Sequence, residues 1–217
     1  MIKVKWIVYW LALWISADIF SQNADFQWWP LVNASVAKGK FKFFFEEQIR
    51  FKNTASKFYL CYSDIGAYYT ANDHLSFGPV FRPWWNFNDD GIDQVNRILF
   101  DVNIKNTTGN FEYSFRERYQ GMMRTQDGVD PKEHFSRNKF ELKYNGWKVK
   151  PFISTEFFIS LFKTTPYFID KSRNTLGLEM KVSEHMAFIP LLMYIKDRSA
   201  LEYQDLFIIG GGYYFIY

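Results

Sequence analysis

The chain has 217 residues, of which 21% are aromatic and 23% charged, with 26 Lys and Arg against 23 Asp and Glu. A net charge of +3 excludes the strong basic field that nucleic-acid-binding proteins use, and a single cysteine excludes an internal disulfide. So many rings beside so many charges fit strands that carry apolar side chains on one face and charged side chains on the other.

The first 21 residues have the layout of a secretory signal peptide. Lys3 and Lys5 precede the apolar run WIVYWLALWI, and small residues follow it. The run is shorter than the roughly 20 residues of a spanning helix, so we expect cleavage between Ala17 and Gln22 rather than retention as an anchor. The mature protein is then expected to be one domain, residues 22–217.

Beyond this leader, apolar and polar residues alternate with a period of two along most of the chain. The segment KFKFFFEEQIRF places Phe41, Phe43 and Phe45 on one face, and Lys42 and Glu46 on the other. Most such segments reach the roughly 9 to 11 residues that a tilted strand needs to cross a bilayer. The pattern predicts strands at 28–36, 40–51, 57–69, 74–83, 93–105, 110–121, 134–145, 147–159, 172–183, 186–196 and 204–217.

Short and long connections alternate between these strands. Turn-rich links fall at 37–39, 70–73, 106–109, 145–146 and 183–185, and longer polar links at 52–56, 84–92, 122–133, 162–171 and 197–203. This rhythm is typical of an outer-membrane barrel, so we predict an all-β, antiparallel up-and-down transmembrane β-barrel. Single-chain bacterial barrels use even strand numbers. We therefore expect ten strands, with the segment from Phe26 to Val36, which Pro30 interrupts, as a lining or plug piece; twelve strands, with one more strand than the pattern shows, is the alternative.

The chain ends in the aromatic run GGGYYFIY. In hydrocarbon no water satisfies an exposed strand edge, so the last strand must pair with an early one to close the sheet. Tyr213, Phe215 and Tyr217 share one face of that strand. Such an ending resembles the C-terminal signal by which outer-membrane barrels are recognised for assembly.

Several strand patterns together resemble a catalogued family. They are the Arg82-Pro83-Trp84 step, the paired Arg116 and Arg118, the RNKFELKY strand with Arg137, Lys139 and Glu141, and Glu156 before Phe157. These patterns are similar to the outer-membrane barrels of domain of unknown function 2490, and the resemblance covers nearly the whole mature chain. It implies a barrel in the outer membrane of a Gram-negative bacterium, and it implies no activity. The DIFSQ end of the leader and the aromatic bias suit the Bacteroidetes group.

Charged side chains on the non-lipid faces of these strands would line the interior. We expect an ionic network of Glu46, Arg50, Arg97, Asp101, Arg116, Arg118, Arg137, Glu141, Glu156 and Glu179. Unpaired buried charge is costly, so opposite charges on neighbouring strands should neutralise each other. Two interpretations stay open: a structural ionic core that fills the lumen, and a charged pore or binding site whose selectivity these residues set.

No catalytic or metal-binding set stands out. His74, His134 and His185 lie at predicted strand ends, each two residues from a serine, without an identifiable third orienting group. The loop NFNDDGIDQ lacks the ligand spacing of an EF-hand, and no CxxC or Cys/His cluster is present. We therefore expect neither catalysis nor a metal or cofactor, with a lipid hydrolase or acyltransferase as the alternative.

The sequence thus predicts a small passive channel or a structural envelope component. Its expected partners are outer-membrane lipid and lipopolysaccharide, with the barrel-assembly machinery during biogenesis, and no nucleic acid. A secreted soluble β-sandwich that binds a ligand is the further alternative, and it would bury the Phe41 to Phe51 face against a second sheet.

Overall fold

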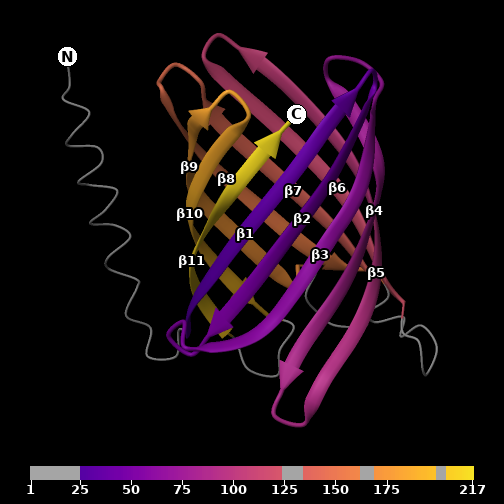
Figure 1. Ribbon diagram of the computed structural model, residues 1–217, viewed down its shortest axis with the longest axis vertical. Coiled ribbons are helices and arrows are strands. Elements are labelled where there is room, and N and C mark those ends of the chain that lie inside the picture. The colour runs from indigo at the N-terminus through magenta and orange to yellow at the C-terminus, as the bar shows by residue number, and fades with distance from the viewer. Residues whose placement is uncertain (1–24, 124–133, 162–168, 199–203) are drawn as a thin grey trace, which may run out of the picture.

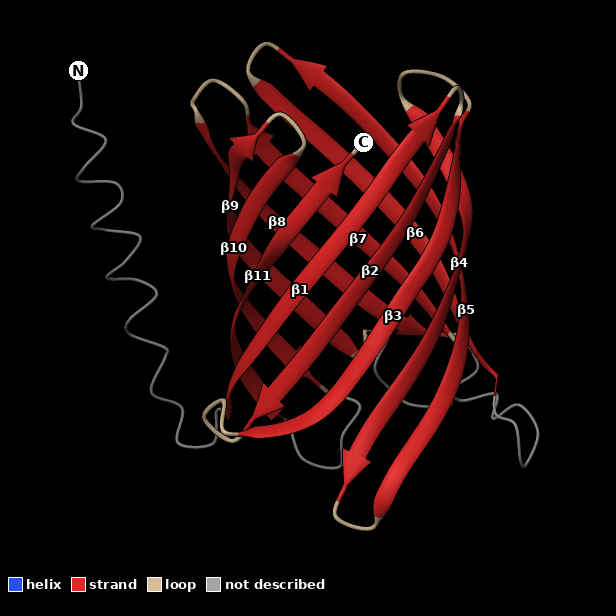
Figure 2. Ribbon diagram, viewed as in Figure 1, coloured by secondary structure: helices blue, strands red, loops and turns tan. Residues whose placement is uncertain are grey.

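The computed structural model describes residues 25–123, 134–161, 169–198 and 204–217, and the predicted signal peptide lies outside these ranges. Within them the chain forms eleven strands that close into one barrel (Figures 1 and 2). No helix in the described ranges is long and apolar enough to cross a bilayer. The strands are β1 Asp25–Lys38, β2 Phe41–Lys52, β3 Lys57–Thr70, β4 Leu75–Asn88, β5 Gly91–Thr108, β6 Phe111–Met123, β7 Phe135–Tyr144, β8 Val149–Ser160, β9 Lys171–Ser183, β10 Met186–Asp197 and β11 Gln204–Ile216.

The strand number is eleven, so the prediction of ten or twelve is wrong. Each strand pairs antiparallel with the next, but β1 and β11 close the barrel as a parallel pair. An up-and-down chain with an odd number of strands sends its first and last strands in the same direction, so a parallel closure is the geometric consequence. The segment predicted to be a lining or plug piece is β1 itself, a full member of the wall.

Pro30 is tolerated in β1 because its position is not paired with β2 and needs no backbone N–H donor there. Along β1, the pairing with β2 stops at Trp28 and resumes at Leu31. The missing N–H of Pro30 therefore falls in a gap between paired positions. On the other side Pro30 lies opposite Gly211 of β11, and Pro190 of β10 lies opposite the same glycine. Gly211 has a φ of 148°, and a Cβ there would lie 2.6 Å from the Ile189 carbonyl oxygen, so only glycine fits.

The connections follow the predicted alternation in part. The short turns at 39–40, 109–110 and 184–185 lie at one end of the barrel, as expected. The predicted long link at 84–92 is wrong, because β4 and β5 stay paired up to Asn88 and Gly91 and leave a two-residue turn. Gly91 permits this turn with a φ of 138°. The predicted links at 122–133, 162–171 and 197–203 fall largely outside the described residues.

The turn between β2 and β3 has an unusual backbone. Asn53, Thr54 and Ala55 have φ values of 55°, 58° and 60°, which is the left-handed region that non-glycine residues seldom occupy. The Asp25 carboxylate at the start of β1 accepts hydrogen bonds from the backbone N–H groups of Asn53 and Thr54, at 3.1 and 3.4 Å. These bonds offset part of the strain and tie the turn to the closing strand.

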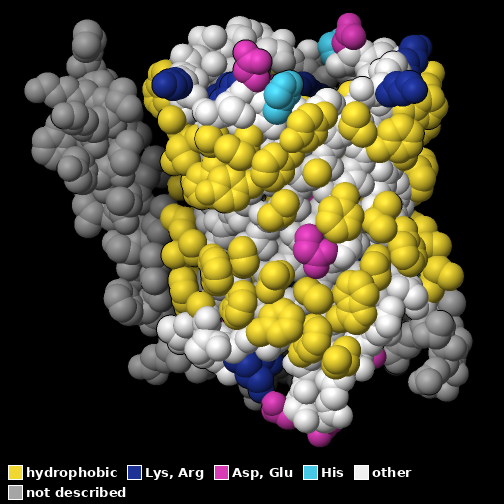
Figure 3. Space-filling view, in the orientation of Figure 1, with side chains coloured by type: hydrophobic (Ala, Val, Ile, Leu, Met, Phe, Trp, Pro, Cys, Tyr) yellow, Lys and Arg dark blue, Asp and Glu magenta, His cyan; other side chains and the backbone are white. Residues whose placement is uncertain are grey.

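The outer surface of the barrel is apolar over most of its height. Large hydrophobic side chains are exposed on every strand, and Figure 3 shows them covering the face over β1 to β3. The Phe41 to Phe51 face of β2 belongs to this surface; Phe41, Phe43 and Phe45 are each about half exposed. The single closed sheet shows that the β-sandwich alternative is wrong.

Two carboxylates interrupt the apolar exterior. Glu47 follows the lumen-lining Glu46, so strand alternation places it outside, where it accepts a hydrogen bond from Ser63 of β3. Glu117 lies outside for the same reason and accepts a hydrogen bond from Ser136 Oγ at 2.7 Å. Each acid therefore has a hydroxyl partner on the neighbouring strand.

One wall of the lumen is aliphatic. β10 and β11 carry apolar residues on both faces, and their inward side chains include Leu191, Met193 and Leu206. Met193 and Leu206 pack against a buried cluster of Trp29, Ile195 and Ile208. The interior therefore has a charged side, formed mainly by β3 to β9, and an apolar side where the barrel closes.

Candidate functional site: the charged lumen

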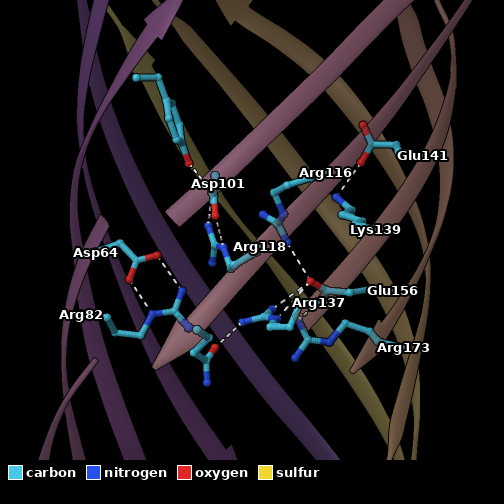
Figure 4. Close-up of polar contacts among 12 residues, drawn as sticks. Asp64, Arg82, Asp101, Arg116, Arg118, Arg137, Lys139, Glu141, Glu156 and Arg173 are labelled. Carbon is cyan, nitrogen blue, oxygen red and sulfur yellow. Dashed lines mark hydrogen bonds and ion pairs between the residues drawn. The ribbon is translucent and has the colours of Figure 1, made fainter. Parts of the chain in front are cut away.

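The most buried part of the lumen holds two bidentate ion pairs. Arg82 donates from Nε and Nη2 to the Asp64 carboxylate at 2.5 and 2.6 Å, and Arg118 donates to Asp101 at 2.6 and 2.7 Å (Figure 4). Asp101 has no exposed surface, and the Tyr68 hydroxyl donates to it at 2.6 Å. Both carboxylates are thus fully engaged, which is the condition for a charge to be tolerated away from water.

A third carboxylate, Glu156 of β8, is shared by three arginines. Arg116 donates to it at 2.8 Å, Arg137 donates twice at 3.0 and 3.2 Å, and Arg173 donates at 3.3 Å. Figure 4 shows the three guanidinium groups converging on this one acid from strands β6, β7 and β9. The cluster carries two more positive charges than negative ones.

Donors exceed acceptors in this cluster. A guanidinium has five N–H groups, whereas a carboxylate accepts about four hydrogen bonds, and Glu156 already receives four. Arg137 uses a further N–H on Gln120 Oε1 at 2.8 Å. Arg116 and Arg173 each donate a single hydrogen bond within the described residues, and the Nε atom of each is buried without a partner.

Strand register explains why these residues meet. Arg116 lies opposite Lys139, Lys139 opposite Glu156, and Glu156 opposite Arg173, so four neighbouring strands form one inward row. The same row continues from Arg173 to Ile195 of β10. The row therefore passes directly from cations into the aliphatic wall.

Further charged pairs lie nearer the end that carries the short turns. Lys143 bridges Glu112 and Glu179 at 3.0 Å each, and Lys150 approaches Glu179 at 3.5 Å. Lys139 donates to Glu141 at 2.7 Å. These pairs neutralise one another across β6 to β9.

Aromatic faces hold several of the remaining arginines. Arg50 lies 3.7 Å from the ring centroid of Trp29, and Arg97 lies 4.0 Å from that of Trp84. Tyr62 stacks on Trp84 with ring centroids 5.5 Å apart and lies 4.0 Å from the Arg82 guanidinium. Desolvated cation–π contacts of this kind stabilise a buried guanidinium in addition to any ion pair that it forms.

These groups surround a cavity of about 780 Å³. Its lining, among the described residues, includes eleven Lys and Arg side chains and five Asp and Glu side chains. The aliphatic wall forms the rest, including Ile189, Leu191 and Met193. The interior is therefore cationic and amphipathic.

All ten charged residues predicted for the lumen face inward. Nine of them line the cavity, and Asp101 lies buried behind Arg118. The list of nine is Glu46, Arg50, Arg97, Arg116, Arg118, Arg137, Glu141, Glu156 and Glu179. The Asn33 side-chain amide donates to Glu46 at 3.1 Å, whereas Arg50 Nε donates to Gln48 at 2.8 Å.

Three important members were missing from the predicted set: Asp64, Arg82 and Arg173. Strand alternation could have found Asp64, since Tyr62 and Asp64 share a face of β3. That face is largely apolar in sequence, so its pattern does not indicate that it is the lumen side. Arg173 is absent from the predicted lumen residues because it lies near the start of β9, close to a predicted loop.

The three histidines lie apart from this network at strand ends, where His74 and His185 are exposed and His134 is half-buried. His74 and His185 approach backbone carbonyls at 3.1 Å, and His134 approaches the Tyr119 hydroxyl at 2.7 Å. Ser136, two residues from His134, donates to Glu117 instead. Among the described residues no group of three or more His, Cys, Asp and Glu side chains could hold a metal ion.

The predicted acidic loop is the tip of the β4–β5 hairpin. Lys57 donates to the Asp89 carboxylate at 2.7 Å, and this hydrogen bond lowers the pKa of that carboxyl below its ordinary value. Both side chains are well exposed, so the pair contributes little to stability. Asp93 lies on β5 rather than in the turn.

The C-terminal aromatic residues lie on the outer surface of the closing strand. Tyr213 and Tyr217 are exposed to 47% and 67%, and Phe215 is partly buried against neighbours on the same face. The backbone of Tyr217 exchanges hydrogen bonds with β1, donating to Ser35 and accepting from Ala37 at 2.9 and 3.0 Å. The chain end is therefore fixed in the wall.

A comparison with models of protein families gives a match. The family model described as a protein of unknown function (DUF2490) matches residues 26–201, from β1 to just beyond β10. No curated protein and no solved structure gives a significant match.

Proposed function

The chain belongs to this DUF2490 family, and we propose that it is an integral outer-membrane β-barrel of a Gram-negative bacterium that serves as a structural envelope component without catalysis. Lipid and lipopolysaccharide surround its exterior, and the signal peptide and barrel-assembly machinery deliver it. The aromatic face of Tyr213, Phe215 and Tyr217 acts as the assembly signal.

The distribution of polarity carries this proposal. Exposed large hydrophobics occur on every strand, while Asp64, Asp101 and Glu156 are at most 2% exposed. A protein surrounded by water would reverse this arrangement, because apolar burial drives its folding and charges prefer solvent. A closed barrel has no unpaired edge, so lipid can contact the whole outer face.

The buried ion pairs favour a closed lumen over an open pore. The Asp64–Arg82 and Asp101–Arg118 pairs and the Glu156 cluster project from β3 to β9 into the middle of the barrel. An open channel would leave such groups hydrated. A narrow passive channel is the second candidate, and the cavity of about 780 Å³ supports it.

Location is tested by fractionation of cells that express the full chain. We expect the mature protein in the outer-membrane fraction, and we expect heat-modifiable migration in gel electrophoresis. Recovery as a soluble periplasmic monomer without detergent would contradict the proposal.

Single-channel recording in planar bilayers separates the two candidates. A closed structural barrel gives no steady current, and Arg137→Gln should open small, irregular conductances by removing one cation from the Glu156 cluster. A stable wild-type conductance whose ion selectivity changes in Arg116→Gln would instead establish the channel.

A further inference from the structure

We propose that the lumen binds an amphiphilic anion, with its oxyanion head on Arg116 and Arg173 and its aliphatic chain along the β10–β11 wall. This inference goes beyond the structural role above. It rests on the interior alone and does not depend on what surrounds the barrel.

The head-group site is defined by surplus positive charge and surplus donors. Arg116 and Arg173 flank Glu156, whose carboxylate already accepts four hydrogen bonds, three on Oε1 and one on Oε2. Their side chains are 24% and 19% exposed to the lumen, whereas Arg137 and Glu156 are 6% and 3% exposed. The two outer arginines therefore remain accessible from the cavity while the inner pair is shielded.

An oxyanion supplies what this cluster lacks. A carboxylate or phosphate brings two or more acceptor oxygens and at least one negative charge, and arginine pairs with both groups through charge-assisted hydrogen bonds. Lys139 lies in the same register row between Arg116 and Glu156, and its side chain is 30% exposed. Because it is paired with Glu141 at 2.7 Å, it borders the site without adding to the surplus charge.

The chain site adjoins the head-group site directly. Arg173 lies opposite Ile195, and Thr175 and Gly177 in β9 lie opposite Met193 and Leu191. Leu191 and Met193 line the cavity and are only partly buried by protein. Gly177 contributes no side chain to the lumen, and the Phe152 ring occupies the space where its Cβ would lie.

The cavity has the size of a ligand rather than of an ion. About 780 Å³ falls within the range of small-molecule sites, which are mostly apolar with a few placed polar groups. A bare phosphate would leave the aliphatic wall of β10 without a partner. An aliphatic chain that ends in an oxyanion uses both parts of the lumen.

Isothermal titration calorimetry of the full mature chain in nanodiscs tests this assignment, with protein-free nanodiscs subtracted. Four probes separate the parts: dodecanoate, dodecyl phosphate, dodecan-1-ol without a charged head, and acetate without a chain. We expect dodecanoate or dodecyl phosphate to bind at least about tenfold more tightly than either partial probe. Whichever of the two binds more tightly identifies the head group.

Two kinds of variant locate the ligand. Arg173→Gln and Arg116→Gln should each weaken binding of the charged twelve-carbon probes about tenfold, while Leu191→Asn should weaken them and leave acetate unchanged. Arg198→Gln, an exposed position at the end of β10, is the matched control and should have no effect. Circular dichroism melts establish that each variant is folded. If one arginine variant does not fold, the other is sufficient for the test.

Four results would overturn the proposal. Acetate that binds as tightly as dodecanoate would reduce the site to a simple anion site, and dodecan-1-ol that does so would reduce it to an apolar cavity. Binding that both arginine variants leave unchanged, or no binding of any probe, would remove the assignment. The proposed location and the proposed closed lumen are tested separately, because fractionation and conductance are measured without these ligands.

Discussion

Single carboxylates in the lumen differ in how completely they are neutralised. Asp64 and Asp101 each have their own bidentate arginine, whereas Glu156 serves three arginines. The two aspartates are therefore structural groups whose loss leaves a buried cation behind. Arg116 and Arg173 each keep a buried Nε without a partner, and they are the residues on which we propose that a ligand acts.

Asp101→Asn is expected to destabilise the barrel by about 3–5 kcal/mol, because it leaves Arg118 buried without its counter-charge. The side chains of Asp101 and Arg118 are 0% and 5% exposed, so water cannot replace the lost carboxylate. Urea unfolding in lipid vesicles measures the effect. The exposed Lys57–Asp89 pair provides the control, and Asp89→Asn should leave the unfolding midpoint unchanged. Equal effects at both positions would contradict a buried, tightly coupled lumen pair.

Glu47 and Ser63 give a test of the proposal that the outer surface contacts lipid. In a bilayer the double variant Glu47→Leu/Ser63→Ala should be more stable than the parent by about 1–3 kcal/mol, since it removes a carboxylate and a hydroxyl from hydrocarbon. The measurement is the same unfolding experiment. Glu117→Leu/Ser136→Ala repeats it four strands further along the wall.

The reverse change, Phe45→Glu on the same face of β2, should lower stability and serves as the control. A loss of stability in the Glu47 variant would show that this part of the exterior contacts protein or water rather than lipid.

At the scale of elements, the β2–β3 turn stores backbone strain that one substitution can remove. Ala55 has a φ of 60°, where glycine is free and alanine is not, so Ala55→Gly should raise stability by about 0.5–1 kcal/mol. Ala67→Gly, within β3, is the control and should lower stability, because glycine gains freedom in the unfolded chain there. Thermal unfolding in vesicles measures both. A destabilised Ala55→Gly variant would mean that the left-handed turn is not the folded state.

The strands were predictable because period-two alternation dominates the sequence, and every predicted strand corresponds to an observed one. The errors came from glycine and proline. Pro30 was interpreted as evidence against a wall strand, although a gap between paired positions accommodates it. The sequence pattern places Gly91 inside a loop, although Gly91 is the first residue of β5 and pairs with Asn88 across a tight turn. Cross-strand pairing determines the structure at both Pro30 and Gly91, and the local sequence pattern does not show which residues pair.

The charged half of the site was predictable and the apolar half was not. Inward charges follow from alternation, but β10 reads MAFIPLLMYIKD, in which neither face is distinguishable as the lumen side. The consecutive Glu46 and Glu47 require that one acid lies outside, a consequence that the sequence already contained. The sharing of Glu156 by three arginines depended on register across four strands, which only the closed barrel fixes.

At the scale of the whole molecule, the odd strand number determines how the barrel closes. β1 and β11 run in parallel from Asp25 beside Leu206 to Ser35 beside Ile216, and β11 brings the aliphatic wall next to Trp29. An odd number is known among mitochondrial barrels, whereas bacterial single-chain barrels are even. A ten-strand alternative would instead pair β11 directly with β2 and place the β1 segment in the lumen. The two closures predict different neighbours for the same residues.

Disulfide cross-linking distinguishes these closures. In a Cys61→Ala background, Val32→Cys/Tyr213→Cys should form a disulfide on mild oxidation, because the two positions are direct partners across the parallel pair. Neighbouring strands are about 4.8 Å apart, which lies within the reach of a disulfide. Phe45→Cys/Tyr213→Cys should not cross-link, since β1 separates β2 from β11 and Phe45 pairs with Ala34. Migration of the unheated, oxidised protein in gel electrophoresis, compared with the reduced sample, reports the bond. Efficient cross-linking of the second pair, with none of the first, would establish a ten-strand wall and would remove the pairing of β1 with β11.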